Sequence, residues 1–573
     1  MDDKMIISNE YIKHLKTIPL LFTTHVFRFS IVPFEGVYRL YRPLYMLSFA
    51  MDYRIWGLNP FGYRLTNVII HSLNAFLVFF LIYKLFSNYP LALLTSILFC
   101  IHPLHTESVC FISGRAELWV SLFTLLSLIF YINYAISLKG LSYFLSLLSF
   151  IFALLSKEAG FLVFVPVFVA ILGLKSKIPK NSIIFHFLSF IGIFAIYMIL
   201  RLTVLVPMQL PFKSPYPFFW DILNFLRVLI EYIKLFIFPY SLHIFRSIMP
   251  ISSFSNADII SPILFLFSLL IITIVSIKRK KYVLLSGISW FILMLLYLIS
   301  FLYYKDFRCV SMEEHWAYLA SIGFFLILAY LILTIKRPKL ITIVSIPIVV
   351  IYGVLTNINS SHWKEEMSFY RYNLEFIEAP LSIIPRLEFM DVLTKRGLYK
   401  EALDEAAFVL STHPQNWIAY LKRGDTLRAM RKFPEAKEAY QNALKIDYFC
   451  WQANQRLKSL AEESGGVYKE EVDPALSPLE AKIVSLIRMG DFDQALYALS
   501  QAISASPTPN LYTFAGITFG KLGSYDKAIE AFNAALKIDQ KYPPALQNLA
   551  IAYENKNLPE KAFQVRETIK QIK

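Results

Sequence analysis

Apolar runs in the first part of the chain are long enough to cross a lipid bilayer as helices, which takes about 20 residues each. Short polar turns separate these runs up to about residue 357. Spans are expected at 64–86, 89–103, 115–136, 141–156, 159–174, 183–203, 221–240, 259–277, 282–303, 315–335 and 339–357. The pattern predicts a multi-spanning helical domain over 64–357, with a polar loop at 1–63 before the first visible span.

The period changes near residue 381, where one motif recurs at a spacing of 33 to 34 residues over its last copies. The motif reads G-x-aromatic-x-x-A, with the glycine replaced in two copies. Copies begin at Gly397, Arg431, Gly490, Gly523 and Asn557. This spacing is typical of the tetratricopeptide repeat, a pair of short helices that stacks on its neighbours. We predict a linker at 358–380 and about five repeats over 381–573, irregular near 451–475, so that the whole chain is all-α.

Composition supports a membrane protein. Hydrophobic residues make up 56% of the chain and charged residues only 17%, whereas soluble domains carry about 25% charge. The net charge of +15 lies entirely in the first 372 residues, with 31 basic and 16 acidic side chains, because residues 373–573 carry 25 of each. A basic excess beside apolar segments orients membrane proteins, so a nucleic-acid-binding function loses its main support. The four cysteines form no CxxC pair, which argues against a zinc site.

Basic loops predict which side of the membrane each turn faces, because cytoplasmic loops collect Lys and Arg. The basic loops lie at 175–180, 278–281 and 336–339. With these inside, the loop at 1–63 and the repeat region fall on the extracytoplasmic side. An even number of crossings must then separate residues 180 and 278, so the charged segment 221–240 is expected to be interfacial or re-entrant. Because a long polar N-terminal loop needs an anchor, we also expect a further transmembrane helix upstream of Met1.

Polar and charged side chains gather at the predicted extracytoplasmic ends of the spans, where they are candidates for function. They are Asp2, Asp3, Arg42, His102, His105, Glu107, Arg115, Lys157, Glu158, Glu314 and His315. Within the first visible span, Asn67, His71 and Asn74 form a polar stripe along one helix face.

Each candidate has a plainer explanation. Asp2 and Asp3 can be solvated terminal charges, and the polar stripe can simply hydrogen-bond neighbouring helices, an explanation about as strong as ligand binding. The motif at 102–107 offers two imidazoles and a carboxylate to a metal, but no further ligand cluster supports that reading. Lys157 and Glu158 can be an ion pair at the interface. Together, these residues suit a group-transfer reaction. A carboxylate would activate the hydroxyl or amine of an acceptor, and the cations would hold an anionic leaving group. The sequence has no P-loop, nucleotide fingerprint or GxSxG motif.

A series of short phrases gives the sequence a specific resemblance. In chain order they are Asp2-Asp3, Tyr41-Arg42-Pro43-Leu44, Trp56-Gly57-Leu58-Asn59-Pro60-Phe61-Gly62, His71 with Asn74, His102-Pro103-Leu104-His105-Thr106-Glu107, Ser113-Gly114-Arg115, Ser156-Lys157-Glu158 and Trp363. In this order they resemble the transmembrane and tetratricopeptide-repeat O-mannosyltransferases and their bacterial relatives. These are integral-membrane glycosyltransferases of the GT-C fold. We therefore expect a bacterial homologue in the inner membrane.

The resemblance implies a polyprenyl-phosphate-linked sugar as donor, mannose being the expected sugar, and inverting transfer to Ser or Thr hydroxyls of an acceptor protein presented by the repeats. One residue of the acidic pair would act as the general base. The donor phosphate would be held by Arg42, His102, His105, Arg115, Lys157 and His315. Supporting roles would fall to Glu107, Glu158, Glu314, His71 and Asn74.

Two departures from the family pattern matter. The family's acidic pair follows its first transmembrane helix, whereas here it stands at residues 2 and 3, in line with the expected upstream helix. The family has Arg where this chain has His315, so phosphate binding there would depend on pH. No cofactor or resident metal is expected, although adjacent aspartates could bind a divalent cation.

Two rival functions remain. A non-catalytic membrane scaffold could use its repeats to assemble envelope or secretion machinery, and it should tolerate Asn in place of Asp2 and Asp3. A transporter is less compatible with the sequence, because the unusual polar groups gather at one face and not at the midplane.

Overall fold

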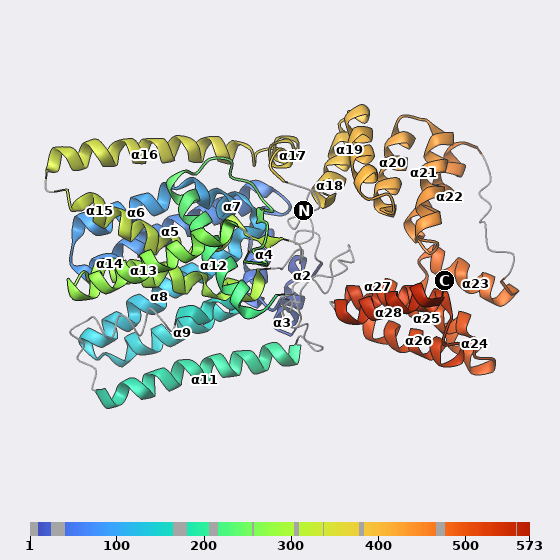
Figure 1. Ribbon diagram of the computed structural model, residues 1–573, viewed down its shortest axis with the longest axis horizontal. Helices are drawn as coiled ribbons and strands as arrows, with labels where there is room; N and C mark the ends of the chain where they lie inside the picture. Colours follow the sequence, from blue (N-terminus) through green and yellow to red (C-terminus); the bar gives the residue numbers. More distant parts are fainter. Residues whose placement is uncertain are drawn as a thin grey trace. The chain divides into compact units, whose positions relative to one another are not determined.

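The computed structural model describes residues 10–23, 40–163, 180–204, 216–254, 257–302, 309–335, 337–377, 383–465, 476–556 and 558–572. The chain divides into two compact units, the first extending to residue 377 and the second beginning at residue 378. Figure 1 shows both units built from helices. The expected all-α fold class is confirmed.

The first unit, here the membrane unit, is a bundle of long apolar helices. Its described α-helices are α2 (Glu10–Lys13), α3 (Ile18–Leu21), α4 (Pro43–Trp56), α5 (Pro60–Phe86), α6 (Tyr89–Ile101), α7 (Thr106–Cys110), α8 (Arg115–Ser137), α9 (Gly140–Ser156), α11 (Lys180–Val204), α12 (Phe218–Ile237), α13 (Ile260–Lys278), α14 (Tyr282–Leu295), α15 (Ser321–Leu333), α16 (Pro338–Ser361) and α17 (Glu366–Leu374). Short 3₁₀ helices connect several of them: η1 (Leu15–Thr17), η2 (Pro103–His105), η3 (Ile112–Gly114), η4 (Glu158–Val163), η5 (Ala257–Ile259), η6 (Leu296–Phe301) and η7 (Glu314–Ala317).

Six described helices are long and apolar enough to cross a membrane, and a seventh span results if α6 and the bent segment after it count as one. The bend of 52° falls between Ile101 and Pro103, where proline cannot continue the helical hydrogen bonds. The chain is therefore a membrane protein. Two further segments, α9 and α15, are apolar but shorter. The expected span at 159–174 lies mostly outside the described residues.

Helix α12, in the segment expected to be interfacial or re-entrant, is not one of the six. One face is buried, with Leu229, Tyr232 and Phe236 in the core, while Glu231 and Lys234 pair with each other on the outer face. Its amphipathic character fits a helix that lies along an interface.

The second unit, here the repeat unit, is a row of antiparallel helix pairs. Its described helices are α18 (Ile383–Lys395), α19 (Tyr399–Thr412), α20 (Trp417–Ala429), α21 (Phe433–Ile446), α22 (Trp451–Glu463), α23 (Pro478–Met489), α24 (Phe492–Ala505), α25 (Pro509–Lys521), α26 (Tyr525–Ile538), α27 (Pro543–Asn555) and α28 (Pro559–Ile572). Five pairs form, and α22 stands between the second and third as a helix without a partner of its own among the described residues. This irregularity falls where the repeat pattern breaks down in the sequence.

The turn glycines of the repeats have the backbone conformation that their motif predicts. Gly397, Gly490 and Gly523 have φ of 75°, 82° and 70°, in the left-handed region that glycine enters without steric cost. Arg431 takes the same place in the second pair with φ of 60°. This copy therefore keeps the same turn, but Arg431 is strained because its side chain disfavours the left-handed conformation.

Small residues also allow the two helices of a repeat to approach closely. A methyl group on Gly516 of α25 would lie 2.4 Å from a carbon of the Phe532 ring in α26. Polar contacts join neighbouring helices at nearly the repeat spacing. Lys422 of α20 contacts Asp391 of α18, and Arg456 of α22 contacts Asp425 of α20, across 31 residues each. The repeats thus stack in a fixed register.

Among its described residues, the membrane unit contains one very small sheet, between β1 (Ser247–Ile248) and β2 (Val310–Ser311). The strands are antiparallel, with Ser247 opposite Ser311. This pairing joins the loop after α12 to the segment that enters η7, and so carries Glu313 and Glu314 to the charged end of the bundle.

Candidate functional site

Segments far apart in the sequence meet at one end of the membrane unit. They are the start of α4, the connection from α6 to α8, the end of α9, the loop after α12, η7 and the end of α16 with α17. Figure 1 shows α4, α7 and α17 at this end, whereas α16 begins at the opposite end. Basic Arg337 and Lys339 stand at that beginning. The candidate site and this predicted cytoplasmic loop therefore lie at opposite ends of the bundle.

The connection from α6 to α8 has a shape that its sequence explains. His102 caps η2, because its Nδ1 accepts a hydrogen bond from the backbone N–H of Leu104 at 3.2 Å. Gly114 lies so close to α7 that a methyl group there would be 2.7 Å from the carbonyl oxygen of Ser108. The chain can therefore fold back on itself and present Glu107 and Glu117 on the same side.

Glu107 and His315 form a bidentate pair at the centre of this end. The backbone N–H of His315 donates to Glu107 Oε2 at 2.8 Å, and its ring Nδ1 lies 2.9 Å from Oε1. The other ring nitrogen is 4.0 Å from Glu117 Oε1. Burial lowers the pKa of the His315 imidazole, but the two carboxylates outweigh burial and the pKa is raised above its ordinary value. The two carboxylates thus favour the protonated form of His315.

Lys157 pairs with Glu117 from the end of α9. The side chains are 7% and 4% exposed, respectively. Burial lowers the pKa of the Lys157 ammonium, and Glu117 opposes this effect. The pair neutralises two charges that neither helix could bury alone.

Glu158, the next residue, is held between two arginines. Nε and Nη2 of Arg42 lie 3.1 and 2.7 Å from its Oε2, and Nη2 of Arg201 lies 3.7 Å from its Oε1. Burial alone would raise the pKa of the Glu158 carboxyl group, but the two guanidiniums bring it down to about 2. The carboxylate is therefore ionised at any physiological pH.

Glu314 lies in a second group of charges. Its Oε1 accepts a hydrogen bond from the backbone N–H of His243 at 2.8 Å and from Arg246 Nη2 at 3.1 Å. Burial raises the pKa of Glu314, Arg246 opposes the increase and Glu107 adds to it, and the pKa is about 8. The Glu314 carboxyl group therefore keeps its proton to a higher pH than an exposed glutamate does.

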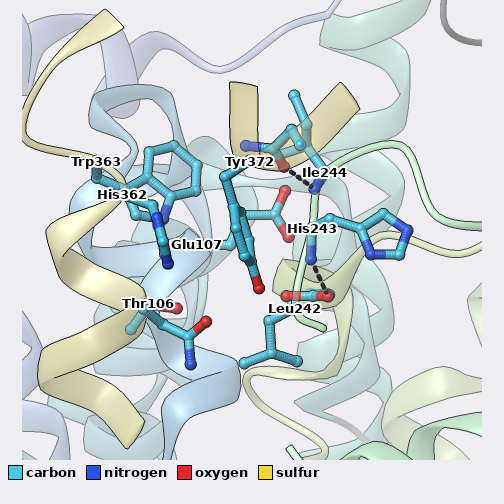
Figure 2. Close-up of a pocket in the computed structure, with 11 residues that line it drawn as sticks. Thr106, Glu107, Leu242, His243, Ile244, His362, Trp363 and Tyr372 are labelled. Atoms are coloured by element: carbon cyan, nitrogen blue, oxygen red, sulfur yellow. Dashed lines mark hydrogen bonds between the residues drawn. The ribbon is translucent and has the colours of Figure 1, made fainter. Parts of the chain in front are cut away.

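A small pocket opens beside these two carboxyl groups. Figure 2 shows the ring of Tyr372 in its middle, between His362 and His243. Thr106, Glu107, Leu242, His243, Ile244, Glu314, Asn359, His362, Trp363, Tyr372 and Asn373 line it. The rings of His362 and Tyr372 are stacked, with their centroids 3.8 Å apart. Trp363, which the resemblance includes, thus lines the same pocket as Glu107 and Glu314.

The polar stripe of α5 makes hydrogen bonds between helices. His71 Nδ1 lies 2.7 Å from the Tyr318 hydroxyl and Nε2 lies 2.9 Å from the Cys100 carbonyl. Asn74 donates to the carbonyl of Leu118 at 3.0 Å and to the same hydroxyl at 3.2 Å. These contacts tie α5 to α8 and to the segment before α15, as the plainer explanation of the stripe expects.

Three of the predicted phosphate ligands lie deeper in the protein. His102 uses its second ring nitrogen at 3.0 Å from the Phe236 carbonyl. Both ring nitrogens of His105 contact protein groups, the Phe99 carbonyl at 2.8 Å and the Ser321 hydroxyl at 3.0 Å.

Arg115, the third, is fully buried and pairs with Asp52 at 2.5 Å. Its Nε donates to Asn67 at 2.8 Å and its Nη2 to the Tyr63 carbonyl at 2.7 Å. The structure therefore brings Arg42, Lys157 and His315 together at the charged end and leaves Arg115 in a separate group.

A metal ion has one candidate location among the described residues. Ligand atoms of Glu107, Glu313 and His315 lie within 4.8 Å of one another. Two carboxylates and an imidazole are a donor set that divalent transition metals accept. In this structure, however, the pair between Glu107 and His315 already satisfies two of the three.

Several charged residues of this end were not among the candidates predicted from the sequence. They are Glu117, Arg201, His243 and Arg246. Glu117 stands two residues after a predicted ligand, but its partners lie 40 residues and more away in the chain, so no local spacing indicates it. The acidic pair Asp2 and Asp3 lies outside the described residues.

Comparisons with known proteins identify similar chains. A Caenorhabditis elegans protein O-mannosyl-transferase is 28% identical over 384 residues, which are 64% of this chain and 52% of that protein. A Xenopus laevis protein named O-mannosyl-transferase tmtc2 is 40% identical over 113 residues, which are 20% of this chain and 13% of that protein. A human protein named O-mannosyl-transferase TMTC3 is 38% identical over 97 residues, which are 17% of this chain and 10% of that protein. The longest of these matches thus covers only about half of the relative's own length.

The repeat unit has matches of its own. The family described as TPR repeat matches residues 516–557, and the family described as tetratricopeptide repeat matches residues 418–450. Among solved structures, YrrB, a tetratricopeptide-repeat protein described as having an unusual peptide-binding site, is 19% identical, covering 36% of this chain and 92% of its own, with a TM-score of 0.16. The two matching repeat families confirm the predicted repeats, and together with the named relatives they confirm the resemblance to the transmembrane and tetratricopeptide-repeat O-mannosyltransferases.

Proposed function

We propose that this relative of the O-mannosyl-transferases moves a mannosyl group from a polyprenyl-phosphate donor to Ser or Thr hydroxyls of a protein. The reaction would be that of a GT-C type glycosyltransferase, with the site and the repeats on the extracytoplasmic face of a bacterial inner membrane. The function extends the names of the similar proteins to this chain.

One observation carries the proposal. Residues of the resemblance that are as far apart in the sequence as Arg42, Lys157 and His315 lie in two neighbouring sets of ion pairs at one end of the membrane unit. Arg42 pairs with Glu158, whereas Lys157 and His315 both lie beside Glu117, and Lys157 is close enough to Arg42 to interact electrostatically with it. Five predicted site residues meet there by pairwise contacts, because Glu107 joins His315 and Glu158 joins Arg42. Random placement of charges in an apolar bundle would be costly, so their collection at one end indicates a use.

The transfer step needs a base, an anion-binding group and an acceptor. Asp2 or Asp3 would take the proton of the acceptor hydroxyl as its oxygen attacks the anomeric carbon. The bond from that carbon to the phosphate oxygen breaks, and the polyprenyl phosphate leaves with the electron pair, which inverts the anomeric centre. Arg42, Lys157 and His315 would stabilise the negative charge on the departing phosphate.

The reaction would need no cofactor and no resident metal ion. A chelator such as EDTA should therefore leave the transfer rate unchanged. A loss of transfer that manganese restores would instead assign a cation to the aspartate pair or to the donor set of Glu107, Glu313 and His315.

The repeat unit would present the acceptor. Stacked helix pairs form extended surfaces that bind peptides and proteins. In this proposal the membrane unit supplies the chemistry and the repeats select the substrate protein.

Label transfer in isolated membranes tests the function. Membranes with the wild-type chain receive polyprenyl-phosphate mannose labelled in the sugar, and parallel samples carry Asp2→Asn, Asp3→Asn and Asp404→Asn. Asp404 is exposed in the repeat unit and serves as the matched control. We expect label on protein with the wild type and the control, and its loss with one of the first two variants at equal expression.

The scaffold alternative predicts a different result. If wild-type membranes transfer no more label than membranes without the protein, the enzyme function is wrong. Normal growth supported by both aspartate variants would then favour a scaffold.

A further inference from the structure

Two guanidinium groups share the single carboxylate of Glu158. Arg42 takes Oε2 with two nitrogens, the nearer at 2.7 Å, while Arg201 stands 3.7 Å from Oε1. The latter distance is too long for a hydrogen bond. Because Lys157 is neutralised by Glu117, the three residues Arg42, Glu158 and Arg201 carry one positive charge in excess.

Donors beside this charge are unused. Arg201 Nε and the Tyr197 hydroxyl are buried and find no hydrogen-bond partner among the described residues. Tyr197 is only 4% exposed, and its hydroxyl is close enough to interact electrostatically with Glu158, Arg201 and Arg42. A buried donor without an acceptor is unfavourable, so an incoming acceptor would relieve this arrangement.

Helix α11 supplies both unused donors on the same face. Tyr197 and Arg201 are four residues apart, and side chains at that spacing lie one above the other on a helix. The helix meets the rest of the membrane unit mainly along α9, beside which Figure 1 shows it at the edge of the bundle. The donors therefore stand where an outer helix packs against the bundle.

The opposite face of α11 is apolar and uncovered. Ile196, Ile199 and Leu202 are 61%, 60% and 42% exposed, respectively, and the helix is a candidate membrane span. In a bilayer these side chains contact lipid tails. A ligand that joined an anionic head to a hydrocarbon chain could place the head at the arginines and the chain along this face.

We propose that Arg42, Arg201 and Tyr197 form a binding seat for the phosphate of a membrane lipid. Guanidiniums bind phosphate oxygens with paired, charge-assisted hydrogen bonds, and a tyrosine hydroxyl donates a third. Glu158 holds the two arginines in place. The seat deepens the proposed function and rests on it in one respect, because the phosphate in question would be that of the polyprenyl donor.

Lipid binding by the purified full chain tests the seat without requiring transfer. Binding of a polyprenyl phosphate is measured in detergent by native mass spectrometry for the wild type, Arg201→Gln, Tyr197→Phe and the control Arg279→Gln. Arg279 is exposed at the end of α13. We expect affinity to fall roughly tenfold or more for Arg201→Gln, as loss of a charge-assisted contact predicts, and severalfold for Tyr197→Phe, with no change for the control.

Tyr197→Phe separates binding from folding. Its hydroxyl contacts no acceptor in the described structure, so its removal should leave the melting temperature unchanged or slightly raised. Unchanged lipid affinity in both Tyr197→Phe and Arg201→Gln would overturn the seat.

Competitors identify the ligand. Excess inorganic phosphate and polyprenol, which has the chain without the phosphate, are each expected to compete poorly. Displacement by inorganic phosphate at concentrations similar to the lipid would overturn the lipid assignment, and displacement by polyprenol would show an apolar groove instead of a phosphate seat.

Transfer assays on the same variants separate the two proposals. If the wild type transfers sugar and Arg201→Gln transfers it equally well, the phosphate seat is refuted, whereas the proposed glycosyltransferase function is supported. Lipid binding that Arg201→Gln abolishes, in a wild-type protein that transfers no sugar, would support the seat and refute the function.

Discussion

The pair of Lys157 and Glu117 gives the sharpest test of how the membrane unit holds its charges. Lys157→Met keeps most of the side-chain volume and removes the charge. It leaves Glu117, whose side chain is 4% exposed, as a buried carboxylate without its principal partner. Breaking a buried ion pair by removing one member costs about 3–5 kcal/mol.

The structure places this cost at the lower end of that range. His315 Nε2 is 4.0 Å from the same Glu117 oxygen, so a protonated imidazole replaces part of the lost attraction. Since the imidazole is more fully protonated at low pH, the loss of stability should be larger at pH 8 than at pH 6. Lys139→Met provides the matched control, because Lys139 is exposed at the start of α9.

Thermal unfolding of the detergent-purified chain, followed by tryptophan fluorescence, measures the effect. We expect a clear decrease in melting temperature for Lys157→Met, none for Lys139→Met, and substantial recovery in the double variant Lys157→Met with Glu117→Gln, which removes the stranded charge. A single variant as stable as the control would refute the buried pair. A double variant as unstable as the single one would show that lost packing, and not stranded charge, causes the effect.

Three further predictions concern other parts of the chain. Gly516→Ala should destabilise the repeat unit by about 1–2 kcal/mol, because overpacking against a buried ring outweighs the helix propensity gained. The control Gly520→Ala should not destabilise it, because a methyl group there meets nothing within 4 Å. Equal hydrogen exchange in α25 for both variants would contradict this prediction. Arg431→Gly should stabilise its repeat by about 1 kcal/mol by relieving the left-handed strain, and an unfolding midpoint that falls would show the strain is absent. The pKa values of His315 and Glu314 are raised, so their contribution to stability is present at low pH and lost as pH rises through the raised pKa values. His315→Gln should therefore flatten the dependence of melting temperature on pH between 5 and 8, and an unaltered slope would argue against this linkage.

The sequence predicted much of the helical architecture because its signals are local. The turn glycines that begin at Gly397 recur with the repeat, and their left-handed backbone follows from the motif alone. Apolar length located α5, α8, α11, α13 and α16 within a few residues. Charged residues on α12 indicated that it differs from the spans, and its buried face explains how it still belongs to the core.

The candidate site was less predictable because its contacts are long-range. Arg42 and His315 were expected to hold phosphate, and the structure pairs them with Glu158 and Glu107, which are 116 and 208 residues away in the chain. Arg201 carries no motif and becomes a candidate only when α11 packs beside α9. No local pattern distinguishes a charge that faces a ligand from one that completes a buried pair.

Arg115 shows the same limit from the other direction. The phrase Ser113-Gly114-Arg115 suggested a phosphate ligand, whereas in the structure Gly114 permits a close turn and Arg115 pairs with Asp52 in the core. A phosphate ligand and a buried ion pair would both explain an arginine at this position. Only the contacts of its side chain in three dimensions distinguish the two roles.

A comparison of two sugar donors tests whether the protein is a lipid-dependent mannosyltransferase. Purified full chain and an acceptor protein extract would receive either polyprenyl-phosphate mannose or a nucleotide-linked mannose, each labelled in the sugar, and label on Ser or Thr would be located by mass spectrometry. We expect label on protein from the lipid-linked donor and none from the nucleotide. Transfer from the nucleotide donor alone, or from neither, would contradict it.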